Sequence, residues 1–519
     1  MFNKQRILSF RTIVVITLLV LNIIIANAAW YKNPELFWFL IFTFPLLVVA
    51  LYDIIQTKHA VIRNYPVIGH FRYFFESIGP ELRQYFFESD LAGKPFNRRQ
   101  RSIVYQRAKN EKQTVAFGMQ ANPSAPGFEW VAHSIYPVTI QEKDLRVMIG
   151  NSQCSQPYSA SIYNIGAMSY GSLSKTAIAA LNQGAKLGGF AHNTGEGGIS
   201  EHHLCGGDLI WQIGTGYFGC RNADGRFDAA AFKKNATRTA VKMIELKLSQ
   251  GAKPGHGGIL PASKNTEEIA AIRLVEPGTT VHSPTRHAEF NSPVSMLEFL
   301  IKLRFLSGGK PVGFKLCIGD KDEFDALCRA IAMTGLTPDF ITVDGAEGGT
   351  GAAPLEFTDN IGMPLYDALS FVKQTVDKYG LSRDIKLIAA GKIITGFDML
   401  KAMALGASAC YSARGMMMSL GCIQALICDS GNCPVGVATQ NPALYKGLHP
   451  AAKKVRVASF HSKTIDATRE MMEACGFSNI ASVVPSKFFR RINEKETESF
   501  EKIYFSQQQV VEKKVLLAI

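Results

Sequence analysis

Short apolar runs alternate with amphipathic helical patterns from about residue 160 of this 519-residue chain. The runs predict buried strands and the segments between them predict helices. This order is typical of parallel β/α units. About eight units fit between residues 160 and 440, so we predict an α/β fold of the (β/α)8, or TIM, barrel class. Predicted strands lie at 161–168, 311–319, 339–351 (ending in a glycine-rich loop), 385–393 and 409–416, and predicted helices at 173–188, 322–335, 363–380 and 396–406.

Glycines and cations gather where the predicted strands end, which is where such barrels carry their chemistry. Taken one at a time, each glycine can be explained by a tight turn, and each lysine by a place on the protein surface. Together they favour a bound phosphorylated cofactor, because the loops after strands seven and eight often bind phosphate. A lysine inside a strand can also hold the electron-rich edge of a reduced flavin. The candidates are Met168, Ser169, Lys315, Gly349, Thr350, Gly391, Lys392, Ala413 and Arg414.

Two further glycine-rich segments carry charge. HNTGEGGIS places Glu196 between glycines, and SQGAKPGHGGILP carries Gln250, Lys253 and His256. A lysine and a glutamine on one loop can clamp a carboxylate through charge-assisted hydrogen bonds, and Arg273 could add a contact. The alternative is a long surface loop.

Three of the ten cysteines, Cys422, Cys428 and Cys433, fall within twelve positions, and Pro434 follows them. Soft thiolates in a loop before proline suit an iron–sulfur cluster, and three ligands fit a three-iron cluster better than a four-iron one. The alternative is a set of buried apolar cysteines. Spacing alone leaves both interpretations open.

Residues 12–30 and 36–52 carry no charge, and a short linker joins them. Both have about the length of a membrane span, which predicts a transmembrane helical hairpin. Basic residues precede and follow the hairpin, so the positive-inside rule places both ends in the cytoplasm, as a two-pass protein of the cytoplasmic membrane with a cytoplasmic catalytic domain. The alternative is a signal peptide over residues 1–28, against which the second span and the clustered thiols argue.

The formal net charge is +13. A basic stretch at 94–112 is either a solvated face, a contact with anionic lipid headgroups or a surface for an acidic protein. Bases and aromatics do not interleave as in nucleic-acid modules, so we expect no nucleic-acid partner.

Five motifs occur in an order that resembles the FMN-binding synthase domain of glutamate synthase: GAMSYGSLS, HNTGEGG, QGAKPGHGG, DGAEGGTGAAP and the cysteine triplet with CPVGVATQ. The resemblance covers about residues 160–450. It is closest to stand-alone members of that family with an N-terminal membrane segment. It implies a (β/α)8 barrel, FMN and a 3Fe-4S cluster held by Cys422, Cys428 and Cys433.

The resemblance also implies an activity. Electrons enter through the iron–sulfur cluster and FMN, and 2-iminoglutarate formed from 2-oxoglutarate and ammonia becomes L-glutamate. Gln250, Lys253 and Arg273 would then hold the oxoacid, with Glu196 and Lys253 as catalytic residues. The strand-end candidates named above would hold FMN.

The chain departs from the family pattern in three ways. Its first cysteine is Cys154, after a membrane hairpin, so we expect no glutaminase domain in the chain. His256 stands where the family usually has Glu, and Ile259 stands where it has a substrate-binding Gln. Loss of such a polar contact can change selectivity by orders of magnitude.

Two alternatives therefore accompany the lead interpretation. One is an FMN oxidoreductase of the same fold acting on another oxoacid or amine, such as an N-methylglutamate synthase. The other is a non-catalytic membrane electron-transfer subunit, against which retention of Gln250, Lys253, Arg273 and Glu196 argues.

No G-x-G-x-x-G fingerprint lies between a strand and a helix, so we expect electrons from a ferredoxin-like protein or a partner reductase. The predicted organisation has four parts. They are two transmembrane helices (1–57), a basic extension (58–150), the FMN-binding barrel with its iron–sulfur loop (151–450), and a helical C-terminal extension (451–519) whose charged stretch 490–502 is expected to be a solvated docking helix.

Overall fold

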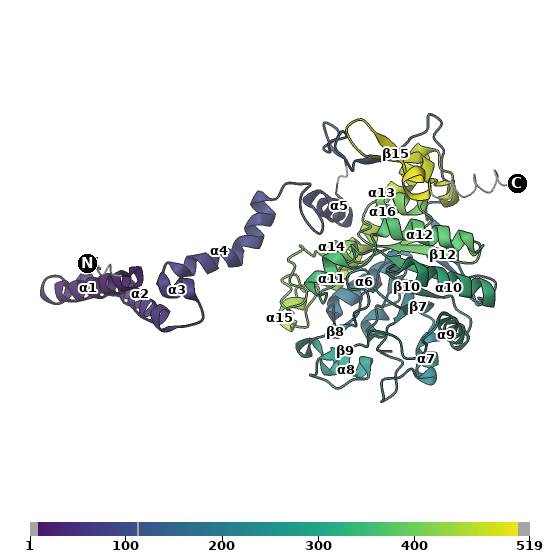
Figure 1. Cartoon of the computed structure of the whole chain (residues 1–519). Helices are drawn as coiled ribbons and strands as arrows, with labels where there is room; N and C mark the ends of the chain where they lie inside the picture. The colour runs from purple at the N-terminus through teal and green to yellow at the C-terminus, as the bar shows by residue number, and fades with distance from the viewer. Residues whose placement is uncertain (1–8, 112–113, 507–519) are drawn as a thin grey trace, which may run out of the picture. The chain divides into compact units, whose positions relative to one another are not determined.

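The computed structural model describes residues 9–111 and 114–506. The chain divides into two compact units, Met1–Arg98 and Arg99–Ile519. The first unit is helical, and the second is built around a barrel (Figure 1).

The first unit begins with a helical hairpin. Helix α1 (Phe10–Tyr31) and helix α2 (Phe37–Ile55) are joined through the turn η1 (Pro34–Leu36). The Thr43 hydroxyl donates to Asn22 Oδ1 at 3.0 Å, and Asn22 Nδ2 donates to the Thr43 carbonyl at 3.2 Å. These polar contacts hold the two apolar helices together. Both halves are long and apolar enough to cross a membrane, by length and composition alone. Then follow α3 (Ala60–Asn64), α4 (Gly69–Leu82) and the π-helical turn η2 (Arg83–Phe87).

The second unit contains a closed barrel of parallel strands, which confirms the predicted (β/α)8 fold. Helices between the strands surround the barrel (Figure 1). In chain order, the barrel strands are β4 (Tyr163–Ile165), β5 (His192–Asn193), β6 (Leu209–Ile213), β7 (Val241–Lys247), β10 (Val312–Leu316), β11 (Phe340–Asp344), β12 (Lys386–Ala390) and β13 (Ala409–Ser412). The helices are α6 (Lys175–Gly188), α7 (Ala229–Ala236), α8 (Glu267–Arg273), α9 (Pro293–Leu306), α10 (Lys321–Thr334), α11 (Leu355–Asn360), α12 (Leu365–Lys378), α13 (Gly396–Ala404) and α14 (Arg414–Leu420).

The first and last strands differ from prediction. Ser161 belongs to β3 (Tyr158–Ser161), which pairs with β2 (Arg146–Ile149) in a separate antiparallel sheet, so the first barrel strand starts only at Tyr163. The predicted strand 409–416 was wrong beyond Ser412, because α14 starts at Arg414. Packing explains the change: α14 buries Met416, Met418 and Leu420 and contacts the long helix α16 (Pro450–Cys475).

The C-terminal segment continues as a small sheet. After α16, strands β14 (Phe488–Arg491) and β15 (Thr497–Ser499) pair antiparallel with each other and with β1 (Glu129–Val131). The prediction that 490–502 forms a docking helix was therefore wrong for its first part. Arg490 Nη2 lies 2.8 Å from Glu129 Oε1, and Phe489 stacks on Trp130 at 5.6 Å, so contacts with the distant strand β1 favour the extended backbone.

A buried polar network lies inside the barrel and centres on Glu245 of β7. Glu245 Oε1 accepts from Asn193 Nδ2 at 2.8 Å and from Gln212 Nε2 at 2.7 Å, and Oε2 accepts from the Thr342 hydroxyl at 2.7 Å. All four side chains are fully or almost fully buried. A buried carboxylate is tolerated when its oxygens are satisfied in this way. The network joins strands β5, β6, β7 and β11.

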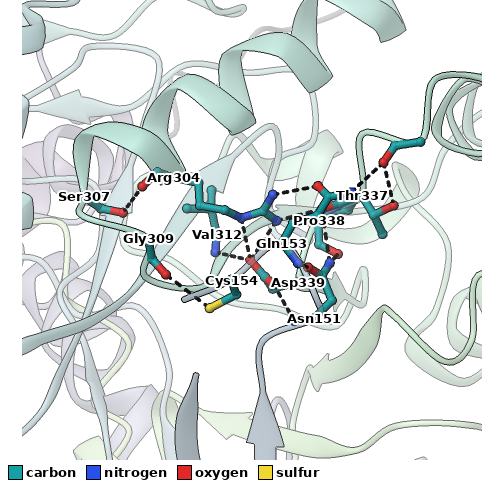
Figure 2. Close-up of polar contacts among 11 residues, drawn as sticks. Asn151, Gln153, Cys154, Arg304, Ser307, Gly309, Val312, Thr337, Pro338 and Asp339 are labelled. Carbon is teal, nitrogen blue, oxygen red and sulfur yellow. Dashed lines mark hydrogen bonds and ion pairs between the residues drawn. The ribbon is translucent and has the colours of Figure 1, made fainter. Parts of the chain in front are cut away.

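A buried ion pair, Arg304–Asp339, lies at the amino-terminal ends of the barrel strands. It also contacts the segment of the chain that precedes the barrel. Arg304 of α9 donates through Nε and Nη2 to Asp339 Oδ2 at 3.1 and 2.8 Å (Figure 2). The same carboxylate accepts the backbone N–H groups of Asn151 and Val312, each at 2.8 Å. Both charged side chains are buried. This ion pair is therefore fully hydrogen-bonded at the edge of the barrel opposite the strand ends that carry the candidate site.

Buried histidines make the folded state sensitive to acid. Burial lowers the pKa of His461 on α16 from 6.5 to about 3, and its Nε2 lies 2.9 Å from the Ser161 hydroxyl. Below about pH 6.5 the unfolded chain binds a proton that the folded chain does not, so stability falls as pH drops towards 3, by about 1.4 kcal/mol per pH unit from this residue. Chemical unfolding at pH 7, 6 and 5 should show a shallower loss for His461→Gln than for wild type. Parallel losses would contradict this assignment.

Candidate functional site

One group of charges surrounds Glu196 in the loop after β5. Lys247, the last residue of β7, places Nζ 2.9 Å from Glu196 Oε1. Lys253 and Arg273 are almost fully buried and also act on this carboxylate. Burial opposes ionisation of Glu196, but the three cations outweigh it and lower its pKa. Three cations thus share one carboxylate.

Arg273 ends α8 and lies deep in this group. Its Nη2 donates to the Tyr170 carbonyl at 3.2 Å, and the guanidinium lies 4.9 Å from the centre of the Phe218 ring. A side chain at Gly197 would come within 2.9 Å of Nη2, so a larger residue there would displace the guanidinium. Burial lowers the pKa of Arg273 to about 10, while Glu196 opposes the shift.

The loop after β7 brings Gln250, Lys253 and His256 close to Glu196. Gln250 and His256 line a small cavity together with Glu196 and Lys247. Lys253 Nζ donates to the Gly257 carbonyl at 2.8 Å. Burial and Lys247 lower the pKa of Lys253, and Glu196 opposes them.

Ile259, the other departure from the family pattern, does not line this cavity. It begins the short strand β8 (Ile259–Leu260), and 37% of its surface is exposed. His256 meets the ring of Phe357 on α11 edge-on, with 5.4 Å between ring centres. Of the two changed residues, only His256 therefore reaches the cavity beside Glu196.

A second group of charges lies where β10 to β13 end. Lys315 Nζ is 3.2 Å from Asp344 Oδ2 at the end of β11. Burial disfavours the charged lysine, yet Asp344 and Glu245 outweigh it and raise the pKa of Lys315. The backbone N–H of Gly251 also donates to Asp344 at 2.8 Å, which ties the lysine-bearing loop to this group.

Arg414, Lys392 and Gly349 meet around Glu347. Arg414 donates to the Glu347 carbonyl, and Lys392 interacts electrostatically with the Glu347 carboxylate. A side chain at Gly349 would come within 2.7 Å of the Arg414 guanidinium. Burial lowers the pKa of Arg414 to about 10, with Asp344 and Glu347 opposing. Thr350 follows in the same loop and is exposed, and Gly391 precedes Lys392 with φ at 144°.

The loop after β4 lies between the ends of β13 and β5, because β4 pairs with both strands. The backbone N–H of Met168 donates to the Asn193 carbonyl at 3.0 Å, and the Ser169 hydroxyl donates to Ser172 at 3.0 Å. Gly195 has φ at 64°, and a side chain there would come within 2.8 Å of the Ser169 nitrogen. Ala413, before α14, lies against Gly166. The loops after the first, second and eighth strands therefore pack together.

The three clustered cysteines occupy the loop after α14. Burial raises the pKa of Cys422 to about 11, and the thiols of Cys428 and Cys433 add to the shift. The loop is held from two sides: the Tyr105 hydroxyl of α5 (Arg98–Lys109) donates to the Cys422 carbonyl at 2.8 Å, and Lys264 Nζ donates to the Cys428 carbonyl at 2.7 Å.

The thiols do not form a site for a single metal ion. Within residues 9–111 and 114–506, no group of three or more His, Cys, Asp or Glu side chains converges in that way. A cluster with several irons needs something different, because each thiolate can take its own iron. Cys433 is buried and Cys422 and Cys428 are half-buried, and three neighbouring soft donors have the chemistry that such a cluster requires.

Sequence reasoning missed Lys247, Glu347 and Lys264. Lys247 could have been found by the same strand-end argument, because it is the last residue of β7. Glu347 stands inside the DGAEGGTG motif. Lys264 carries no sequence signal of its own, and only the folded chain brings it to Cys428.

The protein is thus a (β/α)8 barrel in which positively charged side chains gather at the carboxyl ends of the strands. The family described as "Conserved region in glutamate synthase" matches residues 132–478, so the chain belongs to the glutamate synthase family. This confirms the resemblance read from the five motifs and assigns the chain to a family of oxidoreductases.

Three curated relatives illustrate the match. The chain is 39% identical over 467 residues to the glutamate synthase large subunit-like protein YerD of Bacillus subtilis, covering 82% of this chain and 88% of that protein. It is 33% identical over 382 residues to the archaeal glutamate synthase (NADPH) of Methanocaldococcus jannaschii, covering 72% and 71%. It is 31% identical over 329 residues to the glutamate synthase (NADPH) large chain of Bacillus subtilis, covering 62% and 20%.

Proposed function

We propose that this chain reduces the imine of 2-oxoglutarate and ammonia to L-glutamate, with FMN and a 3Fe-4S cluster as cofactors. One observation carries the choice of substrate. Lys247, Lys253 and Arg273 surround the single carboxylate of Glu196, which leaves an excess of two positive charges in a buried place. A dicarboxylate such as 2-oxoglutarate would balance that excess, because buried charges require partners.

The chain's own residues would divide the work as follows. Arg273 and Gln250 bind the carboxylates, and Lys247 holds Glu196 ionised beside them. Loss of water from 2-oxoglutarate and ammonia gives the imine, and two electrons with two protons then give the amino acid. Lys253, whose pKa is lowered by burial, supplies a proton to the imine nitrogen, and Glu196 keeps the resulting amine in place.

FMN would be held by residues at the ends of the barrel strands. Arg414 and Lys392, with the backbone at Gly349, Thr350 and Gly391, suit its phosphate. Lys315 suits the flavin ring, and Met168, Ser169 and Ala413 complete the cradle. When bound, reduced FMN supplies the hydride. The support is chemical: Lys392 and Arg414, both half-buried, follow strands seven and eight, where barrels of this class bind phosphate.

Cys422, Cys428 and Cys433 would hold the cluster. The support is the donor set of three thiols together with the buried cation of Lys264 beside Cys428. An external ferredoxin-like protein or reductase would supply electrons, and ammonia would come from solution or from another protein. Residues 1–57 would anchor the protein in the cytoplasmic membrane as two spans, with the extension (58–150), barrel domain (151–450) and C-terminal part (451–519) in the cytoplasm.

A second candidate is an enzyme of the same fold that acts on another oxoacid or amine, as an N-methylglutamate synthase does. It is favoured by His256 and Ile259, which replace the Glu and Gln that the family resemblance implies. His256 lines the cavity beside Glu196 and packs on Phe357, which leaves the cavity with less negative charge.

An anaerobic assay tests the proposal. Detergent-solubilised protein is chemically reduced and mixed with ammonium and either 2-oxoglutarate or pyruvate, while flavin absorbance and amino acid are followed. We expect reoxidation in step with L-glutamate, and at least about 100-fold slower reaction with pyruvate, which leaves one cation without a carboxylate. Reduced flavin that persists with 2-oxoglutarate and ammonium but is reoxidised with methylammonium would favour the second candidate. Persistence with both would contradict the proposed reaction.

A further inference from the structure

Lys264 is a buried cation beside the three cysteines. It ends the short 3-10 turn η4 (Ala262–Lys264), just before α8, and only 5% of its surface is exposed. Its Nζ donates to the Cys428 carbonyl at 2.7 Å, and its side-chain carbons lie close to Gly431. Lys264 therefore joins two segments, the one before α8 that leads to Arg273 and the cysteine loop.

Lys264 lacks a carboxylate partner in the described part of the chain. No Asp or Glu oxygen there lies within ion-pair distance of its Nζ, and the groups that act on it electrostatically are Cys428, Asp429 and Cys433. A buried ammonium without a paired anion is costly, and proteins keep one mainly where a charged ligand compensates it. Asp429 acts on Lys264 only from beyond ion-pair distance, so the position of Lys264 points to a further negative charge at the cysteine loop.

We propose that Lys264 is a positioning residue that sets the reduction potential of the iron–sulfur cluster held by Cys422, Cys428 and Cys433. This inference rests on the cluster in the proposed function. Three thiolates give such a cluster a net negative charge, and one-electron reduction adds another. A buried cation stabilises the reduced state more than the oxidised state, so it raises the potential.

The hydrogen bond and the charge can be separated by substitution. Lys264→Arg keeps both. Lys264→Gln keeps a donor for the Cys428 carbonyl but removes the charge, and Lys264→Met removes both at similar length. Tyr105→Phe is the matched control, because it removes a neutral hydrogen bond at the other end of the same loop, to the Cys422 carbonyl.

The measurement is a redox titration of the intact, cluster-loaded protein followed by electron paramagnetic resonance, which reports the cluster without turnover. We expect a more negative midpoint potential in Lys264→Gln and Lys264→Met, a value near wild type in Lys264→Arg, and a small shift at most in Tyr105→Phe. Loss of the cluster from both neutral variants, with retention in Lys264→Arg, would also support the role of the charge.

Two results would overturn the inference. The first would leave the proposed function intact, and the second would also remove the cluster from it. A cluster that keeps its wild-type potential in Lys264→Gln would show that the charge does not act on it, and the proposed function would stand. Wild-type protein that carries flavin but no cluster signal after reconstitution with iron and sulfide would remove the cluster from the proposed function, and this inference with it.

Discussion

Arg273→Met is expected to lower kcat/KM for the oxoacid by about 100-fold or more, with bound flavin unchanged. Removing one member of a buried, hydrogen-bonded charge pair costs about 2–5 kcal/mol, and about 1.4 kcal/mol is a factor of ten. Arg273 is almost fully buried and lies beside Glu196, so water cannot replace it as a partner for a carboxylate. Stopped-flow reoxidation of the reduced flavin measures the loss, and the visible spectrum reports flavin content.

Two variants make this result specific. Arg273→Lys keeps the charge but loses the planar fork, so it should fall between wild type and Arg273→Met. Arg286→Met removes an exposed arginine from a neighbouring loop and should leave the rate unchanged. A wild-type rate in Arg273→Met would contradict a dicarboxylate substrate bound by the two excess positive charges.

The strand-end residues show what a sequence can predict here. Lys315 and Gly349 were placed at the mouth because β10 and β11 are regular apolar runs, and parallel strands end at one edge. Strand β7 has the sequence VKMIELK, in which Glu245 and Lys247 interrupt the apolar pattern. Glu245 is buried only because Asn193, Gln212 and Thr342 satisfy it from other strands. No local pattern contains that information, so β7 was missed, and without β7 the strand-end argument could not be applied to Lys247.

The prediction of a helix at the C-terminal hairpin was wrong for the same physical reason. Residues 490–502 are rich in charge, which by sequence suits a solvated helix. In the structure, Arg490 is paired with Glu129, more than three hundred residues earlier, and Phe488 is buried. The extended form is stabilised by partners that only the folded chain supplies. Lys264 and Cys428 are a further case, since their contact depends on two loops of different β/α units.

Arg304→Met is expected to lower the free energy of unfolding by about 3–5 kcal/mol, because it leaves the buried Asp339 carboxylate without its cation. Asp339 would keep the two backbone donors from Asn151 and Val312, which satisfy its hydrogen bonds but not its charge (Figure 2). Chemical unfolding followed by near-ultraviolet circular dichroism measures the change, because the signal comes from packed aromatic residues of the barrel.

A double variant separates the charge from the loss of packing. In Arg304→Met combined with Asp339→Asn, the amide oxygen can still accept from the backbone and no buried charge remains, so the double variant should be more stable than the sum of the single losses predicts. Lys373→Met is the matched control, because its ion pair with Asp377 lies at the surface and is worth at most about 1 kcal/mol. Strictly additive losses would show that Arg304 acts through its other contacts, with Gln153 and the Thr337 carbonyl. The buried pair would then contribute hydrogen bonds to the barrel rather than a compensated charge.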